Sequence, residues 1–275
     1  MSYDALIRDE KTGITYRQWL CPLPKASLLL VHGLGASSVR WDFLARFLLH
    51  YTLSSYAIEL RGFGETQGLK GHIDSFDTYF HDIQSLCDII KRENNGKKIF
   101  LVGDSMGGLI SFLFAGLRPD LFDGLICISA LFKSRLKFNF LERINIYVSM
   151  IFNPKKQVRI PIDAQMCTRD ASYQKVMDMD PREHRLATPK LLRTIIRAQM
   201  RVRAVKNKIK VPTLFLIAGD LDVLIDPDEV KRVFQGLKTE DKEIIQYPQM
   251  YHSLPVDLDR EKMFHDIAQW VQKRI

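Results

Sequence analysis

Short apolar runs alternate along this chain with longer segments whose apolar residues recur every three or four positions. The short runs predict buried strands, and the longer segments predict amphipathic helices, for example at residues 75–93. Strands separated by helices are typical of a doubly wound, mostly parallel sheet in an α/β fold. We expect eight strands: a hairpin around residues 11–13 supplies two, and the others lie at residues 27–31, 55–60, 98–102, 124–130, 211–218 and 243–247.

The alternation breaks after the sixth of these strands. Between residues 132 and 210 no buried strand is evident, and amphipathic helical segments are separated by prolines. We therefore expect an α/β core formed by residues 1–131 and 211–275, with residues 132–210 inserted as a helical lid. The insertion should lie over the carboxyl ends of the strands, because ligands bind there in open parallel sheets.

The sequence Gly-Asp-Ser-Met-Gly at residues 103–107 directly follows a predicted buried strand. After it comes an apolar segment that can run as a helix until Pro119. Gly-x-Ser-x-Gly between a strand and a helix is typical of a nucleophile elbow, a sharp turn that strains the serine backbone and needs the small glycines. Ser105 is therefore the candidate nucleophile.

A serine hydroxyl becomes a strong nucleophile only when a histidine removes its proton and an acid orients that histidine. In this architecture the acid follows the serine along the chain and the histidine comes last. Among the acids after residues 211–218, Asp222 is favoured because it lies deep enough in the loop to reach across the sheet edge. Asp220 is better explained as a turn residue, and Asp226 is a further alternative. His252 is the predicted base, because it alone of the seven histidines lies in the loop directly after the final strand; His265 lies in the last predicted helix.

The turn His-Gly-Leu-Gly at residues 32–35 follows the first central strand. We predict that the backbone N–H of Leu34 faces the nucleophile and forms an oxyanion hole with the N–H of Met106, at the start of the helix after the serine. The simpler alternative is a turn that only ends the strand. His32 is expected to brace this loop rather than to take part in the chemistry.

Together, these motifs resemble those of the α/β-hydrolases across essentially the whole chain. The matching sequences are His-Gly at 32–33, Arg-Gly-Phe-Gly at 61–64, Gly-Asp-Ser-Met-Gly-Gly at 103–108, Gly-x-x-Asp at 219–222 and His252. Within that superfamily the chain is most similar to the monoacylglycerol lipase and lysophospholipase branch, with further matches at residues 71–76, 168–170 and 180–181. The resemblance implies a serine esterase with a helical lid and with neither a cofactor nor a metal.

From this resemblance we expect hydrolysis of carboxylic esters of the monoacylglycerol or lysophospholipid type, with a small-molecule or lipid ester as partner. A carboxylesterase for small esters, such as hydroxycinnamoyl or feruloyl esters, is one alternative, and a non-catalytic binding protein is the other. Some large apolar residues early in the insertion are expected to line an acyl pocket, although at helical spacing such residues more often cover a core. These residues are Phe138, Phe140, Leu141, Ile144, Ile146, Tyr147, Met150, Ile151 and Phe152.

Two further side chains concern the predicted site. Asp104 stands where relatives often carry histidine. A carboxylate beside the nucleophile would either disfavour anionic acyl groups or bond to neighbouring backbone. His184, in the insertion, is a candidate for lining the substrate pocket.

The net charge of +8 is concentrated in the insertion. Residues 131–210 contain 19 Lys and Arg against 6 Asp and Glu, whereas the rest of the chain contains 21 against 26. Such an excess is typical of a solvated helical surface, and it also fits peripheral contact with an anionic membrane or an acidic substrate. Nucleic acid is not expected as a partner, because no recognised binding motif accompanies the charge.

The first ten residues include acids where a signal peptide would need a basic start and an apolar run. No segment approaches the roughly 18 uninterrupted apolar residues of a membrane span. The four cysteines are widely separated and form no Cys-x-x-Cys pair, which favours free thiols. These features predict a cytoplasmic protein that reaches a membrane only peripherally.

Overall fold

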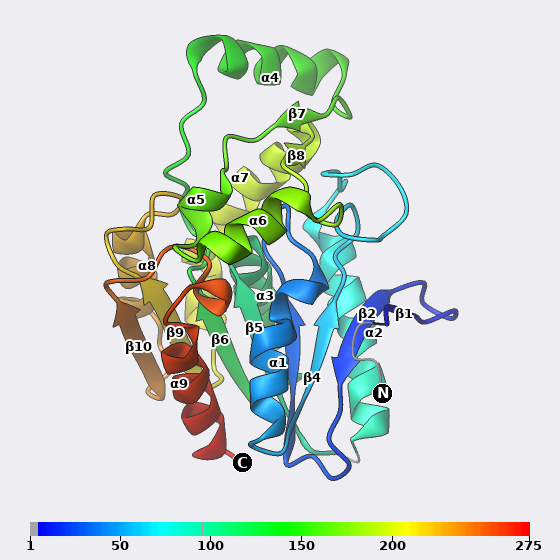
Figure 1. The fold of residues 1–275 in the computed structure, drawn as a ribbon, viewed down its shortest axis with the longest axis vertical. Coiled ribbons are helices and arrows are strands. Elements are labelled where there is room, and N and C mark those ends of the chain that lie inside the picture. The colour runs from blue at the N-terminus through cyan, green and yellow to red at the C-terminus, as the bar shows by residue number, and fades with distance from the viewer. Residues whose placement is uncertain (1–4, 95) are drawn as a thin grey trace.

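The computed structural model describes residues 5–94 and 96–275 (Figure 1). Residues 1–4, which the prediction assigned to the core, and residue 95, at the predicted end of the helix at 75–93, lie outside the described residues. The strands of the large sheet are β1 Ile7–Arg8, β2 Thr15–Trp19, β3 Ala26–Val31, β4 Leu53–Ile58, β5 Lys98–Asp104, β6 Gly124–Ile128, β9 Thr213–Ala218 and β10 Lys242–Tyr247.

These strands lie in the order β1-β2-β4-β3-β5-β6-β9-β10. The pairs β1–β2 and β2–β4 are antiparallel, and every later pair is parallel. The predicted mostly parallel, doubly wound sheet of eight strands is therefore confirmed, and its first two strands form the predicted hairpin.

Both faces of the sheet are buried, as the continuous apolar strands require. In β3, Leu28 and Leu30 pack into one core, whereas Leu29 and Val31 pack into the other, because side chains alternate along a strand. Helices cover both faces (Figure 1): α1 Asp42–Leu49 and α9 Arg260–Gln272 contribute to the first core, and α2 Phe76–Glu93, α3 Met106–Leu117 and α8 Pro227–Gln235 to the second.

The residues between β6 and β9 stand over the carboxyl edge of the sheet (Figure 1). They form α4 Phe140–Phe152, β7 Val158–Arg159, α5 Ala164–Cys167, α6 Ala171–Met179, β8 Leu186–Ala187 and α7 Pro189–Val205. The antiparallel pair β7–β8 corrects the expectation that this segment holds helices only. Each of these strands has two residues, which is too short to show an alternating pattern.

The last helix of this segment packs on the core. Helix α7 begins at Pro189, whose missing N–H is not needed in a first turn, and Thr188 Oγ1 accepts the N–H of Leu191 at 3.2 Å. Its buried residues, including Ile195 and Val202, belong to the same core cluster as α3. Helix α4 instead projects at the far end of the molecule (Figure 1). No helix within the described ranges is long and apolar enough to span a membrane.

Candidate active site

Ser105 lies in the turn between β5 and α3, with φ of +55° and ψ of −116°. A non-glycine residue in this region is strained, and here the surroundings hold it in place. Its N–H donates to the carbonyl of Ile128 at 2.9 Å. A Cβ on Gly107 would lie 2.1 Å from the Val31 oxygen, and one on Gly103 would lie 2.3 Å from the Gly107 oxygen. Both glycines are therefore required by close backbone approach.

His252 brings its ring to the serine from the loop after β10. Its Nε2 lies 2.9 Å from Ser105 Oγ, and the residue is only 4% exposed. The loop is fixed on either side of the histidine. Asp257 accepts the N–H of Tyr251 at 2.5 Å, and the N–H of Ser253 donates to the carbonyl of Cys167 at 2.8 Å.

Asp222 completes the line from the loop after β9. Its Oδ2 lies 2.8 Å from His252 Nδ1, and its Oδ1 accepts the N–H groups of Leu224 at 2.9 Å and Ile225 at 3.1 Å. The carboxylate is fully buried. The two alternatives lie elsewhere: Asp220 is exposed, and Asp226 caps α8 and pairs with Lys133.

The buried carboxylate controls the protonation of the histidine. Burial alone would lower the pKa of His252, but the charge and hydrogen bond of Asp222, together with the charge of Asp104, outweigh it and raise the pKa. A neutral imidazole that donates from Nδ1 to Asp222 leaves Nε2 free to accept the Ser105 proton. The arrangement can therefore act as a proton-accepting unit for an alcohol nucleophile.

The turn at residues 32–35 lies against the nucleophile. A Cβ on Gly33 would be 3.1 Å from Ser105 Cβ, and Leu34 lines the cavity above the serine. Met106 is the first residue of α3. Within the described part of the chain, no hydrogen bond uses the N–H of Leu34 or of Met106 as donor. Both amides are therefore available to a bound oxygen.

His32 braces this turn, as predicted. Its Nε2 accepts the N–H of Leu60 at 3.1 Å, so that Nδ1 carries the proton and donates to the Gly33 carbonyl at 2.9 Å. Complete burial lowers the pKa of His32 to about 3, which keeps the ring neutral.

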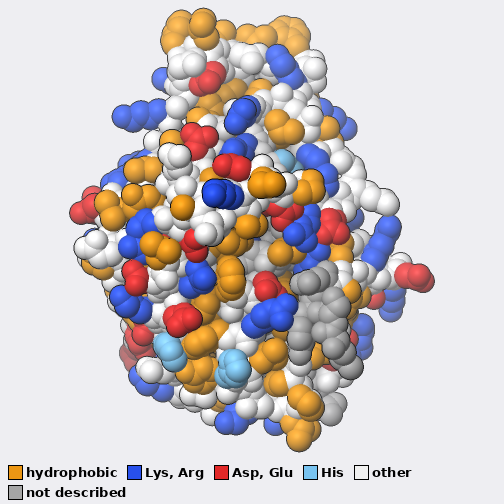
Figure 2. All heavy atoms as spheres, viewed as in Figure 1, with side chains coloured by type: hydrophobic (Ala, Val, Ile, Leu, Met, Phe, Trp, Pro, Cys, Tyr) orange, Lys and Arg blue, Asp and Glu red, His pale blue; other side chains and the backbone are white. Residues whose placement is uncertain are grey.

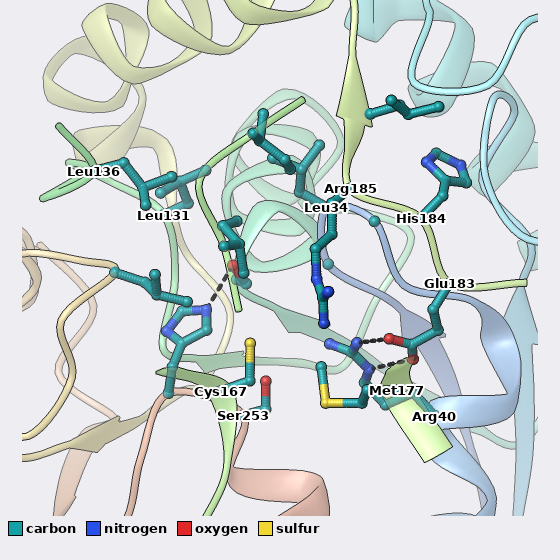
Figure 3. Close-up of a pocket in the computed structure, with 18 of the residues that line it drawn as sticks. Leu34, Arg40, Leu131, Leu136, Cys167, Met177, Glu183, His184, Arg185 and Ser253 are labelled. Carbon is teal, nitrogen blue, oxygen red and sulfur yellow. Dashed lines mark hydrogen bonds and ion pairs between the residues drawn. The ribbon is translucent and has the colours of Figure 1, made fainter. Parts of the chain in front are cut away.

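A cavity of about 270 Å³ is lined by Ser105 and His252 together with residues of the core and of the insertion. Figure 3 shows it with Leu34 and Arg40 from the core and Met177 and Glu183 from the insertion. Arg40, Glu183 and Arg185 contribute charged groups on one side (Figure 3). His184, a candidate for the pocket lining, also lines the cavity; its ring stacks on Phe63 with centroids 5.4 Å apart. The apolar part of the lining includes Leu131, Leu136, Ile160, Ile162, Leu224 and Ile225.

The structure corrects one expectation about this site and excludes one of the two alternatives for Asp104. None of the apolar residues expected to line a pocket contributes to the cavity wall, and Phe140, Leu141 and Phe152 on α4 are exposed instead. Asp104 does not bond to neighbouring backbone. It is 1% exposed, and neither of its carboxylate oxygens has a hydrogen-bond partner among the described residues.

Sequence reasoning missed the ion pair that joins the core to the insertion at the cavity. Arg40 Nε and Nη2 bind the two carboxylate oxygens of Glu183 at 3.1 and 2.5 Å (Figure 3). The partners lie 143 positions apart in the sequence, and no periodic pattern or motif connects them. Cys167 and Ser253, which also line the cavity, carried no signal either. Among the described residues, no group of three or more His, Cys, Asp and Glu side chains is arranged to hold a metal ion.

Comparison with known proteins places this geometry in a family. The family model described as "Serine aminopeptidase, S33" matches residues 22–259. The chain is 30% identical to monoglyceride lipase of Homo sapiens over 258 residues, which cover 91% of this chain and 84% of that protein. It is 26% identical to phospholipase YtpA of Bacillus subtilis over 254 residues, which cover 90% of this chain and 95% of that protein.

A solved structure supports the same relationship. The monoacylglycerol lipase of Paleococcus ferrophilus superposes with a TM-score of 0.84 at 26% identity, covering 95% of this chain and 99% of that one. The matching segment includes all five residues predicted for the site, and the fold agrees over nearly the full chain. The chain therefore belongs to the serine aminopeptidase S33 family of α/β-hydrolases.

Proposed function

We propose that this protein is a serine hydrolase of carboxylic esters, with Ser105, His252 and Asp222 as its catalytic triad. The observation that carries the proposal is the hydrogen-bonded line from Asp222 through His252 to the hydroxyl of Ser105, at the floor of a cavity. The strained backbone of Ser105 is typical of a nucleophile elbow and supports the same role.

In the first half of the reaction, Ser105 Oγ attacks the ester carbonyl while His252 Nε2 takes the hydroxyl proton. The carbonyl electron pair moves onto its oxygen, and the backbone N–H groups of Leu34 and Met106 stabilise the resulting oxyanion. One such donor is worth about 3–4 kcal/mol of transition-state stabilisation. When the intermediate collapses, the bond to the alcohol breaks and the imidazolium returns its proton to the departing alcohol oxygen.

In the second half, a water molecule attacks the acyl-enzyme and gives its proton to His252. The second oxyanion then collapses, the bond to Ser105 Oγ breaks, and His252 protonates the serine as the carboxylic acid leaves. Asp222 keeps the ring in the productive orientation and stabilises its cationic form in both halves.

Esters of the monoacylglycerol or lysophospholipid type are the proposed substrates. The apolar part of the cavity suits an acyl chain, and the charged part around Arg40 and Glu183 suits a polar leaving alcohol. Relatives named monoglyceride lipase and phospholipase support the same class.

A substrate panel tests this proposal. Monoacylglycerols of increasing chain length, lysophosphatidylcholine, ethyl ferulate and an aminoacyl p-nitroanilide are compared with wild-type protein and Ser105→Ala. We expect the highest kcat/KM for a lipid ester, and a loss of 10⁴-fold or more in Ser105→Ala. Activity confined to ethyl ferulate or to acetyl esters would replace the lipid substrate by a small ester. Equal rates for wild type and Ser105→Ala would refute the triad.

We further propose that residues 132–210 form a lid and that α4 brings it to a lipid surface. Phe140 is 74% exposed and Phe152 is 81% exposed, at opposite ends of this helix. Together with Leu141, Tyr147 and Ile151 they gather at one tip of the molecule, where apolar atoms are prominent (Figure 2). Exposed apolar patches of this kind mark interaction sites, and the basic excess of the insertion suits an anionic membrane.

A further inference from the structure

Asp104 is a buried acid that the proposed reaction does not use. It ends β5 immediately before the nucleophile, pairs in register with Ile128 of β6 and is almost fully buried. Both carboxylate oxygens lack a hydrogen-bond partner among the described residues. Burying a carboxyl group without a hydrogen-bond partner reduces the stability of the folded protein, so a functional role is the simplest reason for an acid at this position.

The carboxyl group lies next to the turn proposed to supply one oxyanion donor. Its Oδ2 is 3.7 Å from the position that a Cβ on Gly33 would occupy, and a Cβ there would also be 3.1 Å from Ser105 Cβ. Asp104 therefore lies beside the turn that carries Leu34 and directly precedes the nucleophile, whose Oγ is 2.9 Å from His252 Nε2. From there its charge acts on the reacting groups through a medium with little water.

Charged groups from several elements act on this carboxyl. His252, in the loop after β10, and Arg40, from the turn of 3₁₀ helix at Ser38–Trp41, favour its anionic form. Asp222, in the loop after β9, and Glu183, from the insertion, oppose it. The Cys167 thiol is a further titratable group within its influence. Burial is the largest influence and raises the pKa of Asp104 to about 6.

We propose that Asp104 is a second acid for His252: its carboxylate acts through space on the imidazole, as a positioning residue, and sets the pH at which the base becomes available. This inference rests on the proposed role of His252. Because the two groups influence each other, their protons leave in coupled steps, and the acid limb of the pH–rate profile belongs to the pair rather than to the histidine alone.

The sign of the effect follows from electrostatics. An anionic Asp104 favours the imidazolium, so removing its charge makes neutral His252 available at lower pH. In Asp104→Asn we expect the acid limb of kcat/KM to move down by about 0.5–1 pH unit. One pH unit below the wild-type midpoint, the rate relative to each protein's own plateau would then rise about threefold or more.

The experiment measures the pH dependence of p-nitrophenyl butyrate hydrolysis for wild type, Asp104→Asn and Asp220→Asn. The last variant is the matched control, because Asp220 is an exposed acid two residues from Asp222, and its acid limb should coincide with that of wild type. The inference would be overturned if the midpoint of the acid limb in Asp104→Asn stayed within 0.2 pH unit of that in wild type. A profile in which all rates fall by the same factor would overturn it as well. A structural role alone would lower the rate without moving the limb.

Two further readouts keep the outcome unambiguous. If wild-type protein neither hydrolyses the ester nor reacts with a fluorophosphonate, the proposed function fails before Asp104 is tested. If Asp104→Asn does not fold, the wild-type protein still decides the matter through NMR titration of the His252 ring, assigned by comparison with His252→Gln. Two resolved steps are expected, and a single step would overturn the coupling between the two groups.

Discussion

Asp222 is the residue whose surroundings best explain how the site keeps its geometry. Its two oxygens have separate tasks: Oδ2 faces the His252 ring, and Oδ1 accepts two backbone N–H groups of its own loop. The loop thus holds the carboxylate, and the carboxylate holds the imidazole. A different side chain in place of Asp222 would therefore lose contacts that fix both the loop and the imidazole.

The substitution Asp222→Asn tests the role of this carboxylate in the proposed triad. The amide can keep the shape of the side chain but favours the wrong imidazole tautomer, so we expect kcat to fall by about 10³–10⁴-fold. It also removes the main influence that raises the pKa of His252, so any remaining activity should extend to lower pH. Ester hydrolysis between pH 5 and 9 measures both effects, and a loss below tenfold would argue against the role.

His32 predicts a pH dependence of stability. Its pKa is about 3 in the folded protein and about 6.5 in the unfolded chain, so between these values the unfolded chain binds the extra proton. The contribution of His32 to the free energy of unfolding is therefore fully present above about pH 6.5 and is lost as the pH falls. At pH 5 this group alone should cost about 2 kcal/mol. Urea unfolding at pH 7 and pH 5 measures the change; it should be about 2 kcal/mol smaller in His32→Gln, and equal changes in both proteins would contradict this account.

At the scale of elements, the insertion has a part fixed to the histidine loop and a part that projects. The segment from α5 to α6 is joined to that loop by Thr168 Oγ1, which donates to the Val256 carbonyl at 3.0 Å, and by Arg169. The Arg169 side chain binds Asp257 at 3.0 Å and Asp259 at 2.9 Å. By contrast, most apolar residues of α4 face away from the core.

The substitution Arg169→Gln tests the connection between the segment from α5 to α6 and the His252 loop. Asp257 is fully buried, and it would lose its cationic partner while keeping the backbone N–H groups of Tyr251 and Leu258. We expect a loss of about 1–3 kcal/mol in the free energy of unfolding, together with a lower kcat, because the His252 loop is loosened. Arg118→Gln is the control: its pair with Asp120 is exposed, and its loss should cost less than about 1 kcal/mol. Similar losses in both variants would contradict the coupling.

The elements that local patterns encode were predictable, and those set by distant partners were not. Strand β5 and the glycines around Ser105 are neighbours in sequence, so the elbow could be recognised from a short stretch. The strand ends likewise limited the choice of acid and base to a few residues. The Arg40–Glu183 pair and the β7–β8 ladder depend on segments that meet only in the folded chain. For α4, helical periodicity indicated an apolar face but could not tell what covers it.

At the scale of the whole molecule, charge and apolar surface are distributed unevenly. The insertion carries the basic excess, and its apolar tip projects from the carboxyl edge of the sheet (Figures 1 and 2). Substrate entering from a lipid surface on this side would reach the cavity between the insertion and the core. The amino ends of the parallel strands lie toward the other end of the molecule (Figure 1).

Vesicle sedimentation tests this orientation of the molecule on a membrane by substituting two leucines of similar exposure. Leu141 on α4 is 74% exposed, and Leu23, which precedes β3 at the opposite edge, is 84% exposed. We expect Leu141→Ser to weaken binding to anionic vesicles several-fold and Leu23→Ser to leave it unchanged. Binding of the wild type should be stronger to anionic than to neutral vesicles and should weaken with salt. Equal effects of the two substitutions, or equal binding to both kinds of vesicle, would reject the proposed orientation.

The central claim is that one serine, activated by His252, performs the chemistry. Mass spectrometry of the protein after reaction with a fluorophosphonate tests it most directly, because the reagent leaves a covalent adduct on an activated serine. We predict a single adduct on Ser105, formed more slowly in His252→Gln, absent in Ser105→Ala and suppressed by excess monoacylglycerol. An adduct on another residue, or an unreactive Ser105 in folded wild-type protein, would contradict the account.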